Sequence, residues 1–134
     1  MKRVLIDTNV YSAFKSGDDQ VVEFLAYAEA VFVCPTVAGE LLGGFKAGTR
    51  ERKNRDEFDR FIDSPRVSIL GIDLDTAEYY AQVYRALRAK GKPIPTNDMW
   101  IAAVALQHGL ALCTLDQHFS HIDGLLVEWP TAQS

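Results

Sequence analysis

The sequence predicts an α/β domain built around a mainly parallel β-sheet. Short apolar runs with the length of buried strands recur along the chain, and segments with a helical apolar period separate them. Strands that alternate with helices favour parallel pairing, because each helix provides the crossover connection that a parallel pair needs. The 134 residues fit a single domain over positions 1–134, large enough to bury about two-thirds of its surface on folding.

The first part of the chain contains two strand signals and two helix signals. Residues 4–6 form a short apolar run, and the amphipathic segment 18–28 follows it as a predicted helix. Residues 31–34 are predicted to form a second buried strand, closed by a proline. Thr36 can then cap a helix that carries Glu40.

The middle of the chain is richer in charge. Residues 49–62 are predicted to form a helix whose few apolar side chains make one buried stripe. Residues 67–72 alternate enough to form a third strand. Asp73 or Asp75 then begins a helix that runs to about residue 89.

A loop rich in glycine and proline leads into the last part of the chain. Residues 98–108 are apolar nearly all round, which predicts a buried helix, and a glycine ends it. Residues 110–114 are predicted to form a fourth strand and residues 125–129 a fifth. The tail at 131–134 is expected to fray.

Composition and charge narrow the class of protein. Hydrophobic residues make up 48% of the chain and charged residues 24%, which is typical of a globular domain and not of a disordered one. No apolar stretch approaches the roughly 20 residues that span a bilayer, and the first residues lack the pattern of a signal peptide, so we expect a cytosolic protein. The net charge of −4 argues against a general nucleic-acid coat protein. It does not exclude an enzyme acting on RNA, because bound cations offset an acidic metal site.

Four acidic residues occupy places where the chain changes from strand to helix: Asp7, Glu40, Asp98 and Asp116. A carboxylate at the end of a buried strand is costly to desolvate unless something pairs with it. Ligands in parallel sheets bind at the carboxyl ends of the strands, and Asp7 and Asp116 follow two such ends. When separate segments each deliver a carboxylate, a hard divalent cation is the natural partner, and metal-assisted phosphodiester chemistry is indicated.

Asp98 lies in the first turn of the predicted buried helix, with Thr96 or Asn97 as its N-cap. The helix dipole favours an anion there, and the small alanines that follow would let the helix approach the sheet closely. The alternative is a plain first-turn aspartate that stabilises the helix and nothing more.

Glu40 has apolar neighbours on both sides, which places it near a buried face where a glutamate is rarely left unpaired. The alternative is a surface glutamate. Asp116 follows Thr114 by two residues, so a strand exit would direct a hydroxyl and a carboxylate to the same side. The alternative for Asp116 is a turn or N-cap aspartate.

The ordered set of motifs resembles the PIN-domain ribonucleases, and the length and order resemble the VapC toxins of bacterial and archaeal toxin–antitoxin pairs. The resemblance covers nearly the whole chain. It is carried by Asp7-Thr8-Asn9 after the first strand, Glu40-Leu41 before glycines, Asn97-Asp98 opening an Ile101-Ala102-Ala103 helix, and Thr114-x-Asp116.

The resemblance implies a three-layer α/β/α sandwich and a Mg²⁺- or Mn²⁺-dependent endoribonuclease. It also implies a homodimer, a cognate VapB-type antitoxin that blocks the site, and a larger hetero-oligomer of the two. Carried over by position, Asp7, Glu40 and Asp98 would hold one Mg²⁺, with Asp116 binding directly or through water, since asparagine also occurs at its position. The supporting polar groups would be Thr8, Asn9 and Thr114.

Two basic clusters are candidates for docking the RNA backbone. The first precedes the loop that leads to Asp98, and we interpret it as a rim of the active site, although cations are favoured at a helix C-terminus in any case. It comprises Arg85, Arg88, Lys90 and Lys92. The second is either a docking surface or a solvated helical face. It comprises Lys46, Arg50, Arg52, Lys53 and Arg55.

Other polar and reactive side chains are interpreted as structural. His118 and His121 are three residues apart but lack a matching ligand pair nearby, so they are predicted to be ordinary surface or turn residues. Cys34 and Cys113 are predicted to be reduced core residues in strands. Three tyrosines are assigned to packing or a dimer interface, namely Tyr79, Tyr80 and Tyr84.

Two alternative functions stay open on the sequence. A metal-dependent phosphatase or phosphotransferase also uses aspartates after a first strand, but often with a second aspartate two residues on, where this chain has Asn9. A non-catalytic PIN-like binding module would keep the fold without the activity. The intact set of four acids argues against that second alternative.

Overall fold

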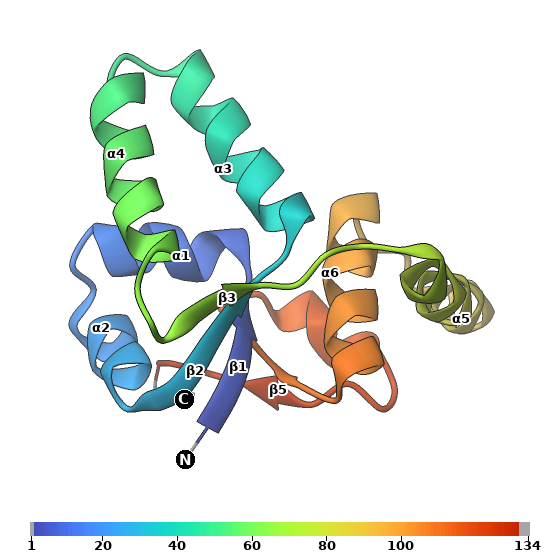
Figure 1. The fold of residues 1–134 in the computed structure, drawn as a ribbon. Coiled ribbons are helices and arrows are strands. Elements are labelled where there is room, and N and C mark those ends of the chain that lie inside the picture. The colour runs from blue at the N-terminus through green and yellow to red at the C-terminus, as the bar shows by residue number, and fades with distance from the viewer. Residues whose placement is uncertain (1, 132–134) are drawn as a thin grey trace.

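Within residues 2–131, a five-stranded, all-parallel sheet lies at the centre of the fold, which confirms the predicted fold class (Figure 1). The computed structural model describes residues 2–131, so the predicted tail lies outside the described residues apart from Thr131. The strand order is β3-β2-β1-β4-β5. The strands are β1 (Lys2–Ile6), β2 (Ala28–Val33), β3 (Val67–Ile69), β4 (Ala111–Cys113) and β5 (Val127–Glu128).

Helices flank the sheet on both sides and complete the α/β/α sandwich. Figure 1 shows α1 and α2 on one side, α6 with α5 outside it on the other, and α3 and α4 as a hairpin beyond the carboxyl end of β2. The helices are α1 (Thr8–Lys15), α2 (Asp19–Ala26), α3 (Pro35–Ala47), α4 (Glu51–Ile62), α5 (Leu74–Lys90) and α6 (Thr96–His108), followed by the 3₁₀ helix η1 (Gln117–His121).

The central strand and one helix make the deepest part of the core. Val4, Leu5 and Ile6 of β1 have no exposed surface, because β2 and β4 pair with both edges of β1. Residues 101–105 of α6 are also buried, as the all-apolar pattern predicts, and their alanines allow the helix to lie close to the sheet. The two cysteines are free and buried, as expected.

Several predicted boundaries are wrong, and the helix caps explain most of them. Helix α1 was not predicted, because half of its eight residues are polar and only Val10 and Tyr11 are buried. Cys34 does not lie in a strand but is the N-cap of α3, ahead of the predicted Thr36. Pro95, and neither Thr96 nor Asn97, is the N-cap of α6.

Two further boundaries concern the middle of the chain. Strand β3 ends at Ile69 and not at residue 72. Asp73, one of the two predicted starts, is the N-cap of α5 and forms a capping box in which its side chain accepts from the Thr76 amide at 3.0 Å. None of the helices within residues 2–131 is both long and apolar enough to cross a membrane.

A buried hydroxyl in α1 offers a test of the packing. Tyr11 is 3% exposed, and among the described residues its hydroxyl has no hydrogen-bond partner. Burial raises the pKa of Tyr11 to about 12, and the charge of Glu57 adds to the shift. Its ring makes edge contacts with Phe58 and Phe61 at centroid distances of 5.4 and 5.1 Å, which a phenylalanine would keep.

Tyr11→Phe is therefore expected to raise the free energy of unfolding by about 1–3 kcal/mol, the cost of an unpaired buried polar group. Urea unfolding followed by circular dichroism measures the change. Tyr27→Phe is the matched control, because Tyr27 is 76% exposed and its hydroxyl can bond water. Equal midpoints for the Tyr11 variant and the wild type would show that the hydroxyl is satisfied in solution.

Candidate active site

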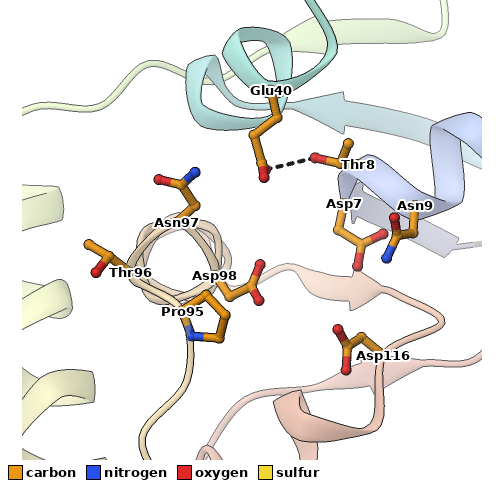
Figure 2. A pocket seen from close by; sticks show the side chains of 9 residues that line it. All are labelled: Asp7, Thr8, Asn9, Glu40, Pro95, Thr96, Asn97, Asp98 and Asp116. Atoms are coloured by element: carbon orange, nitrogen blue, oxygen red, sulfur yellow. Dashed lines mark hydrogen bonds between the residues drawn. The ribbon is translucent and has the colours of Figure 1, made fainter. Parts of the chain in front are cut away.

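A single pocket at the carboxyl ends of the strands contains all four predicted acids. Figure 2 shows their side chains directed into a common space from four different elements. Two of the three predicted supporting residues also line it, while the third, Thr114, lies beneath. The lining residues are Asp7, Thr8, Asn9, Glu40, Pro95, Thr96, Asn97, Asp98 and Asp116.

Asp7 links the end of β1 to the start of α1 and is only 4% exposed. Its Oδ1 accepts from the Val10 amide at 3.0 Å as the N-cap of α1, and its Oδ2 accepts from the Thr114 hydroxyl at 2.5 Å. Burial raises the pKa of Asp7 to about 6, against the lowering effect of these two hydrogen bonds. The charges of Asp98 and Asp116 raise that pKa further. A cation in the pocket would favour the charged form that burial disfavours.

Thr114 connects two of the acids. It is fully buried just after β4, which pairs with β1 and so brings Thr114 beside Asp7. Its hydroxyl donates to Asp7 and accepts from the Asp116 amide at 3.0 Å. Asp116 lines the pocket and is also the N-cap of η1, as the alternative interpretation of that residue predicts.

Glu40 lies on the second turn of α3 and is exposed, contrary to the expectation of a buried face. Val37 and Leu41 are the buried residues of this helix, and Glu40 instead faces the open pocket. Its Oε1 accepts from the Thr8 hydroxyl at 2.8 Å, so α1 orients it (Figure 2).

Asp98 lies in the first turn of α6, as predicted, and its side chain is half-buried. Burial raises its pKa, and the hydrogen bond and charge of His118 oppose that shift. Asp116 and Glu40 add smaller raising effects on the pKa through their charges. The acids therefore influence one another, as expected of carboxylates that share one site.

His118 was predicted to be an ordinary surface or turn residue, and this interpretation is wrong. Its Nε2 lies 2.7 Å from Asp98 Oδ2, and its Nδ1 lies 2.8 Å from Asp116 Oδ1. These three side chains also place potential ligand atoms within 4.8 Å of one another. The Asp-x-His spacing at the start of η1 was the available signal, but the partner Asp98 is twenty residues away and its proximity was not visible.

The comparison with known protein families agrees with this geometry. A family model for the PIN domain matches residues 4–125. The chain belongs to the PIN-domain family. Among curated relatives of this PIN domain, ribonuclease VapC4 of Mycobacterium tuberculosis is 33% identical over 121 residues, covering 90% of this chain and 91% of the relative. Ribonuclease VapC1 of Rickettsia felis is 32% identical, covering 92% and 93%.

Solved structures agree with the assignment of this chain to the PIN-domain family. The PIN domain superposes on a chain of DNA-bound VapBC from Salmonella typhimurium with a TM-score of 0.86 at 25% identity, covering 98% of this chain and 100% of that one. It superposes on a chain of FitAcB from Neisseria gonorrhoeae with a TM-score of 0.81 at 31% identity, covering 95% and 97%.

The donor set of this PIN domain fits a hard divalent cation. Four carboxylates converge from the ends of β1 and β4 and from α3 and α6, and oxygen atoms are the ligands that Mg²⁺ and Mn²⁺ accept. The buried Asp7 carries a charge that two hydrogen bonds compensate only in part. A cation bound among these side chains would offset the remaining charge.

The predicted basic rim does not line this pocket. Lys90 donates to Asp123 at 2.7 Å and to the His121 carbonyl at 2.9 Å, and Arg88 donates to the Tyr84 hydroxyl at 3.1 Å. Tyr80 stacks on Trp100 with ring centroids 4.2 Å apart, in agreement with a packing role for this tyrosine.

The second basic cluster lies on the α3–α4 hairpin. Two of its members are paired there, Lys46 with Glu51 at 2.8 Å and Arg55 with Asp59 at 3.2 Å. These pairs favour the solvated-face interpretation for the residues concerned. RNA docking by either cluster stays a prediction.

Proposed function

We propose that this PIN-domain protein is a metal-dependent endoribonuclease and the toxin of a VapBC-type toxin–antitoxin pair. The observation that carries the proposal is the convergence of Asp7, Glu40, Asp98 and Asp116 in one pocket. The ribonuclease names of its relatives in Mycobacterium tuberculosis and Rickettsia felis support the choice of RNA. The match covers about nine-tenths of the length of each of these relatives.

Asp7, Glu40 and Asp98 are the residues that would hold Mg²⁺ or Mn²⁺, with Asp116 bound directly or through water. Such a cation, when bound, supplies a polarised water for attack on phosphorus and offsets charge on the phosphate oxygens. Thr114 and the α1 backbone keep Asp7 in place, and Thr8 keeps Glu40 in place. The side chains of Asn9 and Asn97 line the same pocket and offer hydrogen bonds to a phosphate or sugar.

The proposed partners are inferred from the solved structures that resemble this chain. Structural neighbours from Salmonella typhimurium and Rickettsia felis were solved as DNA-bound VapBC complexes. By analogy, we propose that this chain forms a homodimer and binds a VapB-type antitoxin that covers the pocket. Expression of the chain alone is then expected to arrest growth, and co-expression of the adjacent small gene product to relieve the arrest.

Metal removal tests the activity directly. Purified, antitoxin-free protein is incubated with total RNA and Mg²⁺, and new 5′ ends are mapped at nucleotide resolution. We expect discrete cleavage sites that disappear with EDTA and return when excess Mg²⁺ or Mn²⁺ is added, because water activation and charge compensation depend on the cation.

Two other outcomes would point away from this function. Cleavage that persists in EDTA would contradict the metal dependence. No new ends under any metal condition, together with release of inorganic phosphate from small phosphomonoesters, would favour the phosphatase alternative. No activity on either substrate would favour the binding module.

A further inference from the structure

We infer that His118 is a positioning residue of the metal site, one that holds the carboxylates of Asp98 and Asp116 at a set distance from each other. The inference rests on the proposed function, because it concerns the same metal site. The imidazole lies between the two carboxylates, with Nε2 at 2.7 Å from Asp98 and Nδ1 at 2.8 Å from Asp116. Each ring nitrogen is thus within hydrogen-bond distance of one carboxylate oxygen.

The backbone around His118 fixes the ring in this place. The Asp116 side chain accepts from the His118 amide at 3.2 Å, so the same two residues are joined twice. The neighbouring Phe119 is fully buried and anchors η1 in the core. At the far end of η1, Lys90 of α5 donates to the His121 carbonyl at 2.9 Å. His118 therefore belongs to a short helix that hydrogen bonds hold at both ends and that Phe119 anchors in the core.

The position of His118 bears on the repulsion between two carboxylates of the site. Asp98 and Asp116 come from α6 and from the segment after β4, and their like charges disfavour a close approach. The imidazole lies between the two carboxylates and contacts one oxygen of each, which fixes their separation and leaves the second oxygen of each as a donor atom for a cation. The carboxylates are then arranged before the cation binds.

The direction in which metal affinity changes when His118 is removed distinguishes a positioning residue from a competitor for the carboxylates. If His118 only competed with the cation for the carboxylate oxygens, its removal would free those oxygens and would tighten metal binding. If it positions the ligands, its removal weakens metal binding, and hydrogen-bonding partners of metal ligands typically contribute about 10–100-fold to affinity.

Mn²⁺ binding to the purified, RNA-free protein tests the inference without reference to cleavage. The dissociation constant is measured by electron paramagnetic resonance of free Mn²⁺ for the wild type, His118→Ala, His118→Gln and His121→Ala. We expect His118→Ala to weaken binding about 10–100-fold. His118→Gln should recover part of the loss, because its amide can donate to one carboxylate. His121→Ala, which removes a matched histidine from the same 3₁₀ helix, should leave binding as in the wild type.

Electron spin echo measurements on the Mn²⁺ complex add a spectroscopic control. A positioning residue gives no signal from a directly coordinated ¹⁴N nucleus, whereas such a signal in the wild type would overturn the inference in favour of a direct histidine ligand. Unchanged or tighter Mn²⁺ binding in both folded His118 variants would overturn it as well. Failure of the wild type itself to bind Mn²⁺ would instead refute the metal-dependent function, and the inference would fall with it.

Discussion

Asp98→Asn is expected to lower the rate of RNA cleavage by about 1,000-fold while the protein stays folded. A bound metal contributes several kcal/mol to stabilising the transition state, and each 1.4 kcal/mol corresponds to about a factor of ten in rate. The substituted side chain would keep the size and one oxygen of the aspartate but lose the charge that a cation requires. The measurement is the initial rate of cleavage at a mapped site in the presence of Mg²⁺.

Asp75→Asn is the matched control for this variant. Asp75 occupies the first turn of α5 as Asp98 occupies the first turn of α6, but its side chain is exposed and does not line the pocket. The two substitutions therefore remove the same favourable interaction with a helix dipole. Equal rates for the two variants would contradict a metal-binding role for Asp98 and return it to the status of an ordinary first-turn aspartate.

Asp7→Asn is expected to abolish cleavage and, at the same time, to stabilise the metal-free protein at neutral pH. The pKa of Asp7 is raised from its ordinary value of 3.8 to about 6, mainly by burial, so the folded protein binds this proton more tightly than the unfolded chain does. Between those two pKa values the folded state holds more protons, and stability falls as pH rises. Above about pH 6 the full penalty is present, about 3 kcal/mol for a shift of roughly two pKa units.

Asparagine carries no charge and can still accept the Val10 amide, so the variant keeps the helix cap without this penalty. In EDTA at about pH 7.5 its free energy of unfolding should exceed that of the wild type by up to about 3 kcal/mol, and the advantage should disappear toward about pH 4, where Asp7 of the folded protein is protonated. Asp18→Asn is the control, because Asp18 is the N-cap of α2 but is exposed. A stability difference for Asp7→Asn that does not change with pH would show that charge burial is not its cause.

The fold class followed from local patterns that survive in the structure. The apolar runs are short and the helices between them are amphipathic, so parallel pairing was the consistent solution. The buried character of α6 was visible because its apolar residues cover the whole circumference of the helix. Helix α1 was missed for the opposite reason: it buries only two side chains, and its start depends on Asp7 acting as a cap.

For the site, the sequence alone indicated which carboxylates to consider. Asp7 follows a strand, Asp98 opens a buried helix, and a charged group at such a position needs a partner. The same reasoning placed Glu40 near a buried face, but α3 projects from the sheet and leaves that side chain exposed to the pocket. The apolar neighbours of Glu40 in the sequence could not reveal this orientation, because it depends on how the α3–α4 hairpin is placed relative to the sheet.

The sequence by itself determined the alternation of strands and helices, apart from α1 and η1, and the positions of the four acids, because apolar periodicity and strand-end polarity are local properties of the chain. Only the tertiary structure decided which groups touch. Thr114 reaches Asp7 across 107 residues because β1 and β4 pair in parallel, and His118 reaches Asp98 because η1 packs beside the start of α6. Such contacts depend on strand register and helix placement, which arise from the packing of the whole core.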